Sequence, residues 1–293
     1  MDEKKKQIEE SRVNFLNYFK KIRIINWAIF ALMILVFILD FVLLKDKMTI
    51  ALIVSIVLIV AAFVYLKIVR SKINSRTRKY INDFYALIDD IEIAAINVND
   101  FTSLAEDTFT IEDIKNAQFM KDLVSCKSKN TVQFDMYEKT IQMADLMFSV
   151  TNPKDAQKPI VAFCGKFIQY HSNKNYDDRI VLYRKTTIEN CYGPTDVEGL
   201  EKVIDNDKLL VYATSKNYNK IFNSNLISKI ESIEVNDYLY DFTITINGNL
   251  ITIALSYADK LVAVPLQEPT DFASYDQIIN DLKFVSEEII KTI

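Results

Sequence analysis

The chain has 293 residues, of which 50% are hydrophobic, and a formal net charge of −4. The charge is unevenly divided, because residues 1–79 hold 15 Lys and Arg against 6 Asp and Glu, which leaves the remainder strongly acidic. An acidic domain argues against nucleic-acid binding, since that affinity depends on neutralising phosphates.

Two apolar stretches follow a short charged start. Ile24–Leu44 and Thr49–Val69 each have about 21 residues, enough for a helix to cover the ~30 Å hydrocarbon layer of a bilayer. Neither contains Pro or Gly, so each can satisfy its own backbone hydrogen bonds in lipid. A soluble core helix is rarely apolar around its whole circumference. We therefore predict a two-helix transmembrane hairpin over residues 24–69.

Basic residues cluster beside these stretches and predict their orientation. Seven Lys and Arg precede the first stretch and six follow the second, whereas the connecting loop holds two. This bias places both termini in the cytoplasm and the protein in the plasma membrane. We expect membrane-surface contacts from Lys20, Lys21, Arg23, Lys67, Arg70, Lys72, Arg76, Arg78 and Lys79, and interfacial positions for Trp27 and Tyr65. Asp40, inside the first span, is interpreted as interfacial, with an ion or proton pathway as the alternative.

Helices are expected on both sides of the hairpin. Residues 1–23 form an amphipathic juxtamembrane helix that lies along the membrane or packs against the helix after the second span. Residues 70–97 form a helical stalk with an apolar stripe at Ile81, Phe84, Ile88, Ile91 and Ala95. Packing of this stripe within the chain is the simpler interpretation, and a homodimeric coiled coil is the alternative.

Residues 98–293 are expected to form one cytoplasmic α+β domain, built on a mainly antiparallel β-sheet flanked by helices. A short helix is predicted over residues 111–123, capped by Thr110 and Asp113. Further helices are expected over residues 224–235 and 275–290. Strands are expected at residues 132–136, 143–150, 159–170, 178–186, 209–214 and 261–266, with 159–170 central and 178–186 its antiparallel neighbour.

The Asn247-Gly248 dipeptide predicts a hairpin with a two-residue type I′ turn. Such a turn pairs Ile246 with Asn249 and Ile244 with Ile251. All apolar members then lie on one face of the sheet.

Candidate chemistry is sparse. The one histidine, His171, lies seven residues after Cys164 in a predicted strand, so the two side chains point to opposite faces. This parity argues against a Cys-His nucleophile and against a zinc site formed with Cys126 and Cys191. Asp205-Asn206-Asp207 lacks the glycine and glutamate of a calcium loop. We therefore assign no catalytic, cofactor or metal residues.

The segment Phe163-Cys-Gly165-Lys-Phe167 and the order of elements around it resemble a bacterial membrane-protein family named domain of unknown function 3137. The resemblance extends over the Leu209–Ile233 segment, the closing hairpin and the terminal helix. It implies a two-span hairpin, a stalk and a cytoplasmic α+β domain, and it implies no catalytic residue. Compared with such proteins, this chain is poor in glycine around Phe134–Tyr137.

These observations favour a non-enzymatic interaction or scaffold module, tethered to the membrane and binding a protein partner. One alternative is an accessory subunit of a transporter or envelope complex, with Asp40 and Ser55 as intramembrane contacts. The other is an enzyme or small-ligand binder with a cleft beside the Phe163–Phe167 strand. The sequence leaves partner identity and oligomeric state, including a homo-oligomer, open.

Overall fold

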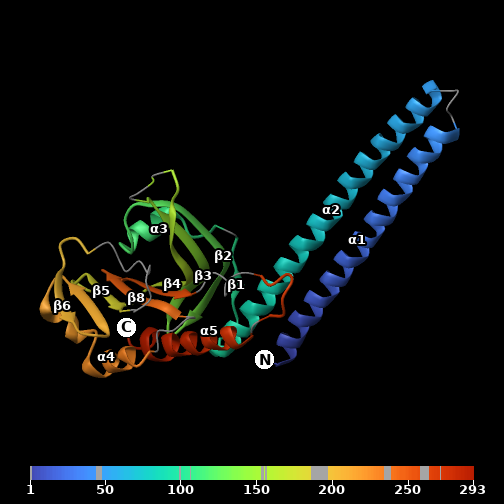
Figure 1. Ribbon diagram of the computed structural model, residues 1–293. Coiled ribbons are helices and arrows are strands. Elements are labelled where there is room, and N and C mark those ends of the chain that lie inside the picture. Colours follow the sequence, from blue (N-terminus) through green and yellow to red (C-terminus); the bar gives the residue numbers. More distant parts are fainter. Residues whose placement is uncertain are drawn as a thin grey trace. The chain divides into compact units, whose positions relative to one another are not determined.

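The computed structural model describes residues 2–43, 48–98, 100–105, 107–152, 155, 157–185, 197–233, 239–257, 264–270 and 272–293 (Figure 1). In chain order the elements are α1 (Asp2–Leu43), α2 (Met48–Ala95), β1 (Thr102–Ser103), α3 (Ile111–Asn116), β2 (Leu123–Met136), β3 (Lys139–Val150), β4 (Ile160–His171), β5 (Ile180–Arg184), β6 (Glu201–Asp205), β7 (Leu209–Ala213), the 3₁₀ helix η1 (Lys216–Lys220), α4 (Ser224–Glu231), β8 (Leu239–Asn247), β9 (Leu250–Tyr257), α5 (Phe272–Phe284) and the π-helical η3 (Val285–Ile290). Contacts divide the chain into two compact units, Met1–Leu87 with Val264–Thr270, and Ile88–Ala263 with Asp271–Ile293.

The first unit is a hairpin of two long helices, α1 and α2, which run side by side in opposite directions (Figure 1). The Tyr65 hydroxyl donates to Asn26 Oδ1 at 3.0 Å, and the rings of Phe15 and Tyr80 stack with centroids 5.0 Å apart. The start of α1 therefore packs against the part of α2 that follows the second apolar stretch, which was one of the two predicted arrangements. Both helices are long and apolar enough to cross a membrane, and their apolar windows are not buried in the fold.

A short segment, Val264–Thr270, belongs to the same unit. The carbonyl of Gln267 accepts from Arg12 Nη1 at 3.2 Å, and that of Pro265 accepts from the Tyr80 hydroxyl at 2.7 Å. The predicted strand at 261–266 lies partly outside the described residues, and its described part, 264–266, is not a strand.

The second unit contains a nine-stranded sheet in the order β1-β2-β3-β4-β9-β8-β5-β7-β6, and every pairing in it is antiparallel. The predicted α+β class is confirmed, and the apolar strand β4 is interior as expected. The predicted pairing of β4 with the 178–186 strand is wrong, because the β8–β9 hairpin lies between β4 and β5.

The β8–β9 hairpin forms, but its register differs from the prediction by two residues. Asn247 pairs with Leu250 and Ile244 with Ile253, so the turn residues are Gly248 and Asn249. Gly248 has φ +62° as the first turn residue and Asn249 has no positive φ, a combination typical of a type II′ turn. A register shift of two residues leaves each side chain on the same face of the sheet, so the apolar residues of the hairpin still share one face, as predicted.

The sheet has a different cover on each face. On one face, α3 and the segment after it pack on an aromatic core, with Phe119 against Phe148, Phe163 and Phe167. On the opposite face lie α5, η3 and the last turns of α2, shown by the buried contacts of Tyr257 with Asp281 and of Lys166 with Glu92.

The predicted helices of this unit form, with shorter bounds in two cases. The Thr110–Asp113 capping box is present, but α3 ends at Asn116, shortly before Gln118 takes a left-handed conformation with φ +50°, and β2 begins at Leu123. Leu226 and Ile230 face inward from α4. The five predicted apolar positions of the last helix are all buried: Ile278, Ile279, Leu282, Val285 and Ile289.

Candidate functional site

The residues predicted to touch a membrane surface are all exposed. This holds for Lys20, Lys21, Arg23, Lys67, Arg70, Lys72, Arg76, Arg78 and Lys79. Trp27 is 66% exposed, and the Arg76 guanidinium lies 5.2 Å from the centre of the Tyr18 ring. Cations and amphipathic rings therefore occur together where the apolar stretches of α1 and α2 meet their charged halves. The side chain of Asp40 lies outside the described residues.

One cation counted for orientation has a different role. Arg12 is only 6% exposed and pairs with the Glu9 carboxylate, whose pKa it lowers. It therefore serves packing at the start of α1 rather than the membrane surface.

The thiols and the histidine do not converge. Cys164 is buried, whereas His171 is exposed on the same strand, with Nδ1 3.2 Å from Asn249 Oδ1. Cys191 lies outside the described residues. In the described parts of the chain, no group of three or more His, Cys, Asp or Glu side chains is placed to hold a metal ion.

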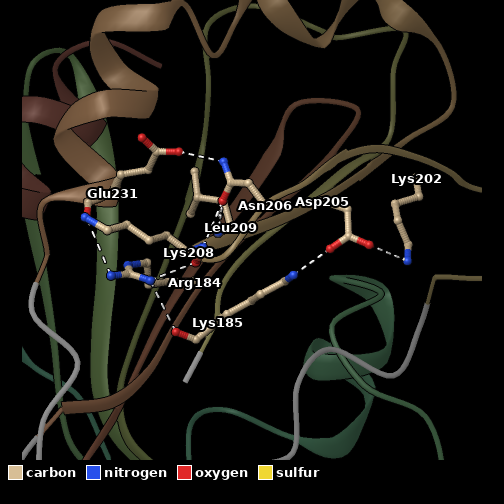
Figure 2. A network of polar contacts seen from close by, with 8 residues as sticks. All are labelled: Arg184, Lys185, Lys202, Asp205, Asn206, Lys208, Leu209 and Glu231. Atoms are coloured by element: carbon tan, nitrogen blue, oxygen red, sulfur yellow. Dashed lines mark hydrogen bonds and ion pairs between the residues drawn. The ribbon is translucent and has the colours of Figure 1, made fainter. Parts of the chain in front are cut away.

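Asp205, the first acid of the incomplete calcium-loop motif, forms ion pairs instead (Figure 2). Lys185 Nζ and Lys202 Nζ lie 2.5 and 2.9 Å from its two oxygens, and their hydrogen bonds lower the pKa of this carboxyl to about 2. Asn206 Oδ1 accepts from the backbone N–H of Lys208 and Leu209, which fixes the β6–β7 turn.

Arg184, at the end of β5, joins this turn to α4 (Figure 2). Its guanidinium donates to the carbonyls of Lys208 at 2.8 Å and of Ile233 at 3.2 Å. Glu231 Oε1 accepts from Asn206 Nδ2 at 2.8 Å. These side chains are engaged with one another and with backbone, so the network supports the local fold.

A second ionic cluster is buried under the end of α2. Lys166 Nζ on β4 lies 2.6 Å from Glu92 Oε2 and 2.7 Å from Asp145 Oδ1, and both Lys166 and Glu92 are 2% exposed. Asp145 is the register partner of Lys166 across β3 and β4. Asp89, one turn before Glu92, is also buried, and its Oδ1 has no hydrogen-bond partner among the described residues.

Burial and mutual charge shift the protonation of this cluster. Burial raises the pKa of Asp89 to about 8, although Lys166 opposes the shift. Burial also raises the pKa of Glu92, again against the effect of Lys166. Burial would lower the pKa of Lys166, but Asp145 and Glu92 outweigh it and raise that pKa. The ammonium therefore stays charged, and the surplus acids favour protonation.

This cluster was not predicted, although two features of the sequence point to it. Lys166 is the one charged residue within a segment that is apolar on both faces, and Glu92 lies beside the apolar stripe of the stalk. A charged residue inside such an apolar segment is expected to be buried, and a buried charge requires a partner of opposite charge. Nothing in the sequence identified Asp145 as the second acid.

A cavity of about 720 Å³ lies along the outer edge of β2 in the sheet unit. Its lining residues are Ile96, Asn97, Val98, Asp100, Phe101, Thr102, Gln133, Phe134, Asp135, Met136, Tyr137, Ser286 and Glu287. We call it the β2 groove. Ser286 and Glu287 in this lining belong to η3, which is π-helical. The π-helical conformation is often found at functional sites.

The strand segment Phe163–Phe167, predicted to flank a cleft, is packed instead. Phe163 and Phe167 are buried, and the Phe148 ring stacks on Phe163 with centroids 5.0 Å apart. Gly165 allows the close approach of β9, since a Cβ there would lie 1.9 Å from the Leu255 carbonyl oxygen. The motif therefore builds the core.

Comparisons with known proteins add little to this geometry. No family model and no curated protein matches the chain, so the resemblance to the domain of unknown function stays a prediction. The crystal structure of the mycobacterial trehalose monomycolate transport factor A, TtfA, is similar to this chain at 9% sequence identity, covering 70% of this chain and 96% of that chain with a TM-score of 0.37. A similarity at that level supports no argument about function.

Proposed function

We propose that the chain is a membrane-anchored interaction module, whose antiparallel sheet domain lies in the cytoplasm and binds a protein partner. The observation that carries this proposal is the α1–α2 hairpin. Its apolar windows are left unburied by the rest of the fold, and lipid is the solvent in which such helices are stable.

The distribution of cations supports the orientation. The nine exposed Lys and Arg side chains lie at or beyond those ends of the two apolar stretches that face away from the connecting loop, while the loop supplies only Lys45 and Lys47. Cytoplasmic flanks of membrane spans carry such an excess of Lys and Arg. In this proposal, residues 1–23 form the juxtamembrane helix, 24–69 the spans, 70–97 the stalk and 98–293 the cytoplasmic domain.

The sheet domain supports a binding role more than a catalytic one. The segment Phe163–Phe167 is filled by packed aromatic rings, and the side chains of Lys166 and Glu92 are each only 2% exposed. The β2 groove is a hollow of about 720 Å³ on this unit, and the outer edge of β2 forms part of its lining. The same proposal includes membership of the bacterial two-span family that the sequence resembles.

A thiol-labelling experiment tests the orientation. Asp46→Cys, in the loop between the spans, and Lys291→Cys, exposed at the end of the domain, are treated with a membrane-impermeant maleimide in intact spheroplasts. Asp46→Cys is expected to label at once, and Lys291→Cys only after permeabilisation. The wild-type chain measures the background from its native thiols. Labelling of Lys291→Cys in intact spheroplasts would refute the proposal, as would recovery of the wild-type chain in the soluble fraction.

A further inference from the structure

The outer edge of β2 offers unpaired backbone to the β2 groove. The β2–β3 hairpin turns at Tyr137-Glu138, so Met136 pairs with Lys139 next to the turn. In a two-residue hairpin the residues that flank the turn exchange hydrogen bonds, and the backbone groups of the next residue point outward. The N–H and C=O of Asp135 therefore point away from β3 and into the groove.

The neighbouring strand stops just short of Asp135. On this edge β1 pairs Thr102 with Gln133 and Ser103 with Val132, and it extends no further. Before Thr102, residues 96–98, 100 and 101 also line the groove and do not belong to a strand. Among the described residues, no strand therefore lies beside Phe134–Met136 on the outer side.

The side chains around this edge are acidic and apolar. Asp100, Asp135 and Glu287 line the groove and are exposed, and its lining includes no Lys or Arg. Phe101 and Met136 are half-buried there, and Tyr137 is 44% exposed. An occupant that matches this lining is extended, basic and partly apolar, since the open edge supplies hydrogen bonds and the walls supply negative charge.

We propose that the β2 groove binds the basic cytoplasmic segment of another membrane protein, which adds to the sheet as a strand beside Phe134–Met136. This inference rests on the proposed function, because a cytoplasmic domain on a membrane anchor faces the Lys- and Arg-rich flanks of other membrane proteins. Anchoring both partners in one bilayer raises their effective concentration, so a modest affinity is sufficient.

The test measures peptide binding to the full-length protein in detergent micelles by fluorescence anisotropy. The probe is a fluorescein-labelled octapeptide amide of four Lys-Val repeats, and the matched peptides replace every Lys by Glu or place Pro at the fourth residue. The Lys-Val peptide is expected to bind, and more weakly as salt rises from 50 to 300 mM, because exposed charges are screened. The Glu-Val peptide is expected not to bind, and the Pro peptide to bind at least tenfold more weakly.

Variants separate the charge from the backbone edge. Asp100→Asn with Glu287→Gln removes two of the three groove acids and is expected to weaken binding about tenfold, since exposed ion pairs contribute up to about 1 kcal/mol each. Glu112→Gln with Glu201→Gln makes the same charge change at exposed positions outside the groove and is expected to leave binding unchanged. Asp135→Pro removes the outward N–H and is expected to abolish binding, while Asp135→Asn keeps that N–H and retains part of it.

Three results would overturn the inference. The first is equal binding by the groove double variant and its control, and the second is binding of the Glu-Val peptide. The third is absence of Lys-Val binding; if the groove double variant then also changes oligomeric state, a second copy of the chain is the occupant. If Asp135→Pro fails to fold, comparing the groove double variant with the Glu112→Gln, Glu201→Gln control still tests whether the peptide binds in the groove. Peptide binding in micelles does not depend on membrane orientation, so it and the thiol-labelling experiment can fail separately.

Discussion

Lys166 Nζ lies 2.6 Å from Glu92 Oε2, with both side chains almost fully buried between the sheet and the last turns of α2. The same ammonium lies 2.7 Å from Asp145 Oδ1 on the adjacent strand. One cation therefore compensates two acids inside the domain. Removing one member of a buried ion pair leaves an uncompensated charge, which is more destabilising than the pair itself is stabilising.

Lys166→Met is accordingly expected to lower the free energy of unfolding of the sheet domain by about 3–5 kcal/mol. The measurement is urea denaturation in detergent micelles, followed by the β-sheet circular dichroism signal. Lys127→Met, at an exposed position of β2, is the control and is expected to change stability by less than about 0.5 kcal/mol. Adding Glu92→Gln and Asp145→Asn to Lys166→Met should restore part of the loss. If the triple variant is no more stable than the single one, charge compensation is not the cause.

The buried Asp89 predicts a pH dependence of stability. Burial raises its pKa in the folded domain from about 3.8 to about 8, with Glu92, Asp145 and Asp90 adding to the shift and Lys166 opposing it. The folded state therefore holds a proton that the unfolded state releases between these values. This stabilisation is complete below about pH 4 and is lost as the pH rises through about 8.

Asp89→Asn should remove this part of the dependence, because an amide does not ionise. Relative to wild type, the variant is expected to gain stability as the pH rises from 4 to 8, by on the order of 1–3 kcal/mol at pH 8. Asp83→Asn, exposed on the same helix, should follow the wild-type curve. Parallel curves for Asp89→Asn and wild type across this range would contradict the prediction.

Gly165 permits the contact between β4 and β9. A Cβ at this position would lie 1.9 Å from the Leu255 carbonyl oxygen and 2.9 Å from its carbon, both backbone atoms that cannot rotate away. Gly165→Ala is expected to destabilise the domain by about 3 kcal/mol or more, through strand separation. Gly199→Ala offers a comparison, because a Cβ there meets nothing within 4 Å and only its φ of +76° opposes the change. That variant should lose about 1 kcal/mol in the same denaturation assay, and equal losses would argue against the steric cause.

Local sequence patterns predicted most of the helices and strands, but they did not predict which strands pair when these lie far apart in the sequence. The capping box at Thr110 and Asp113 and the buried stripe of the last helix depend on residues three to seven apart, and both are confirmed. The neighbours of β4 depend on where the β8–β9 hairpin inserts, since β4 pairs with residues of β9 such as Ser256, the partner of Gly165, and the prediction there was wrong. The β2 groove was missed for the same reason, because it exists only where β1 stops, and the length of β1 is not apparent from its polar sequence.

The β2–β3 turn carries backbone strain that one substitution should relieve. Tyr137 and Glu138 have φ of +50° and +61°, a left-handed pair that is typical of a type I′ turn and is usually built with Asn and Gly. A residue with a Cβ in this left-handed region is strained by about 1 kcal/mol. Glycine removes this strain, and the relief is expected to outweigh the stability that is lost because glycine raises the conformational entropy of the unfolded chain. Glu138→Gly is therefore expected to raise the free energy of unfolding by up to about 1 kcal/mol, measured by urea denaturation. Glu138→Ala keeps a Cβ at the same φ and should give no such gain, so equal stabilisation by both variants would show that the removed carboxylate, and not the strain, was responsible.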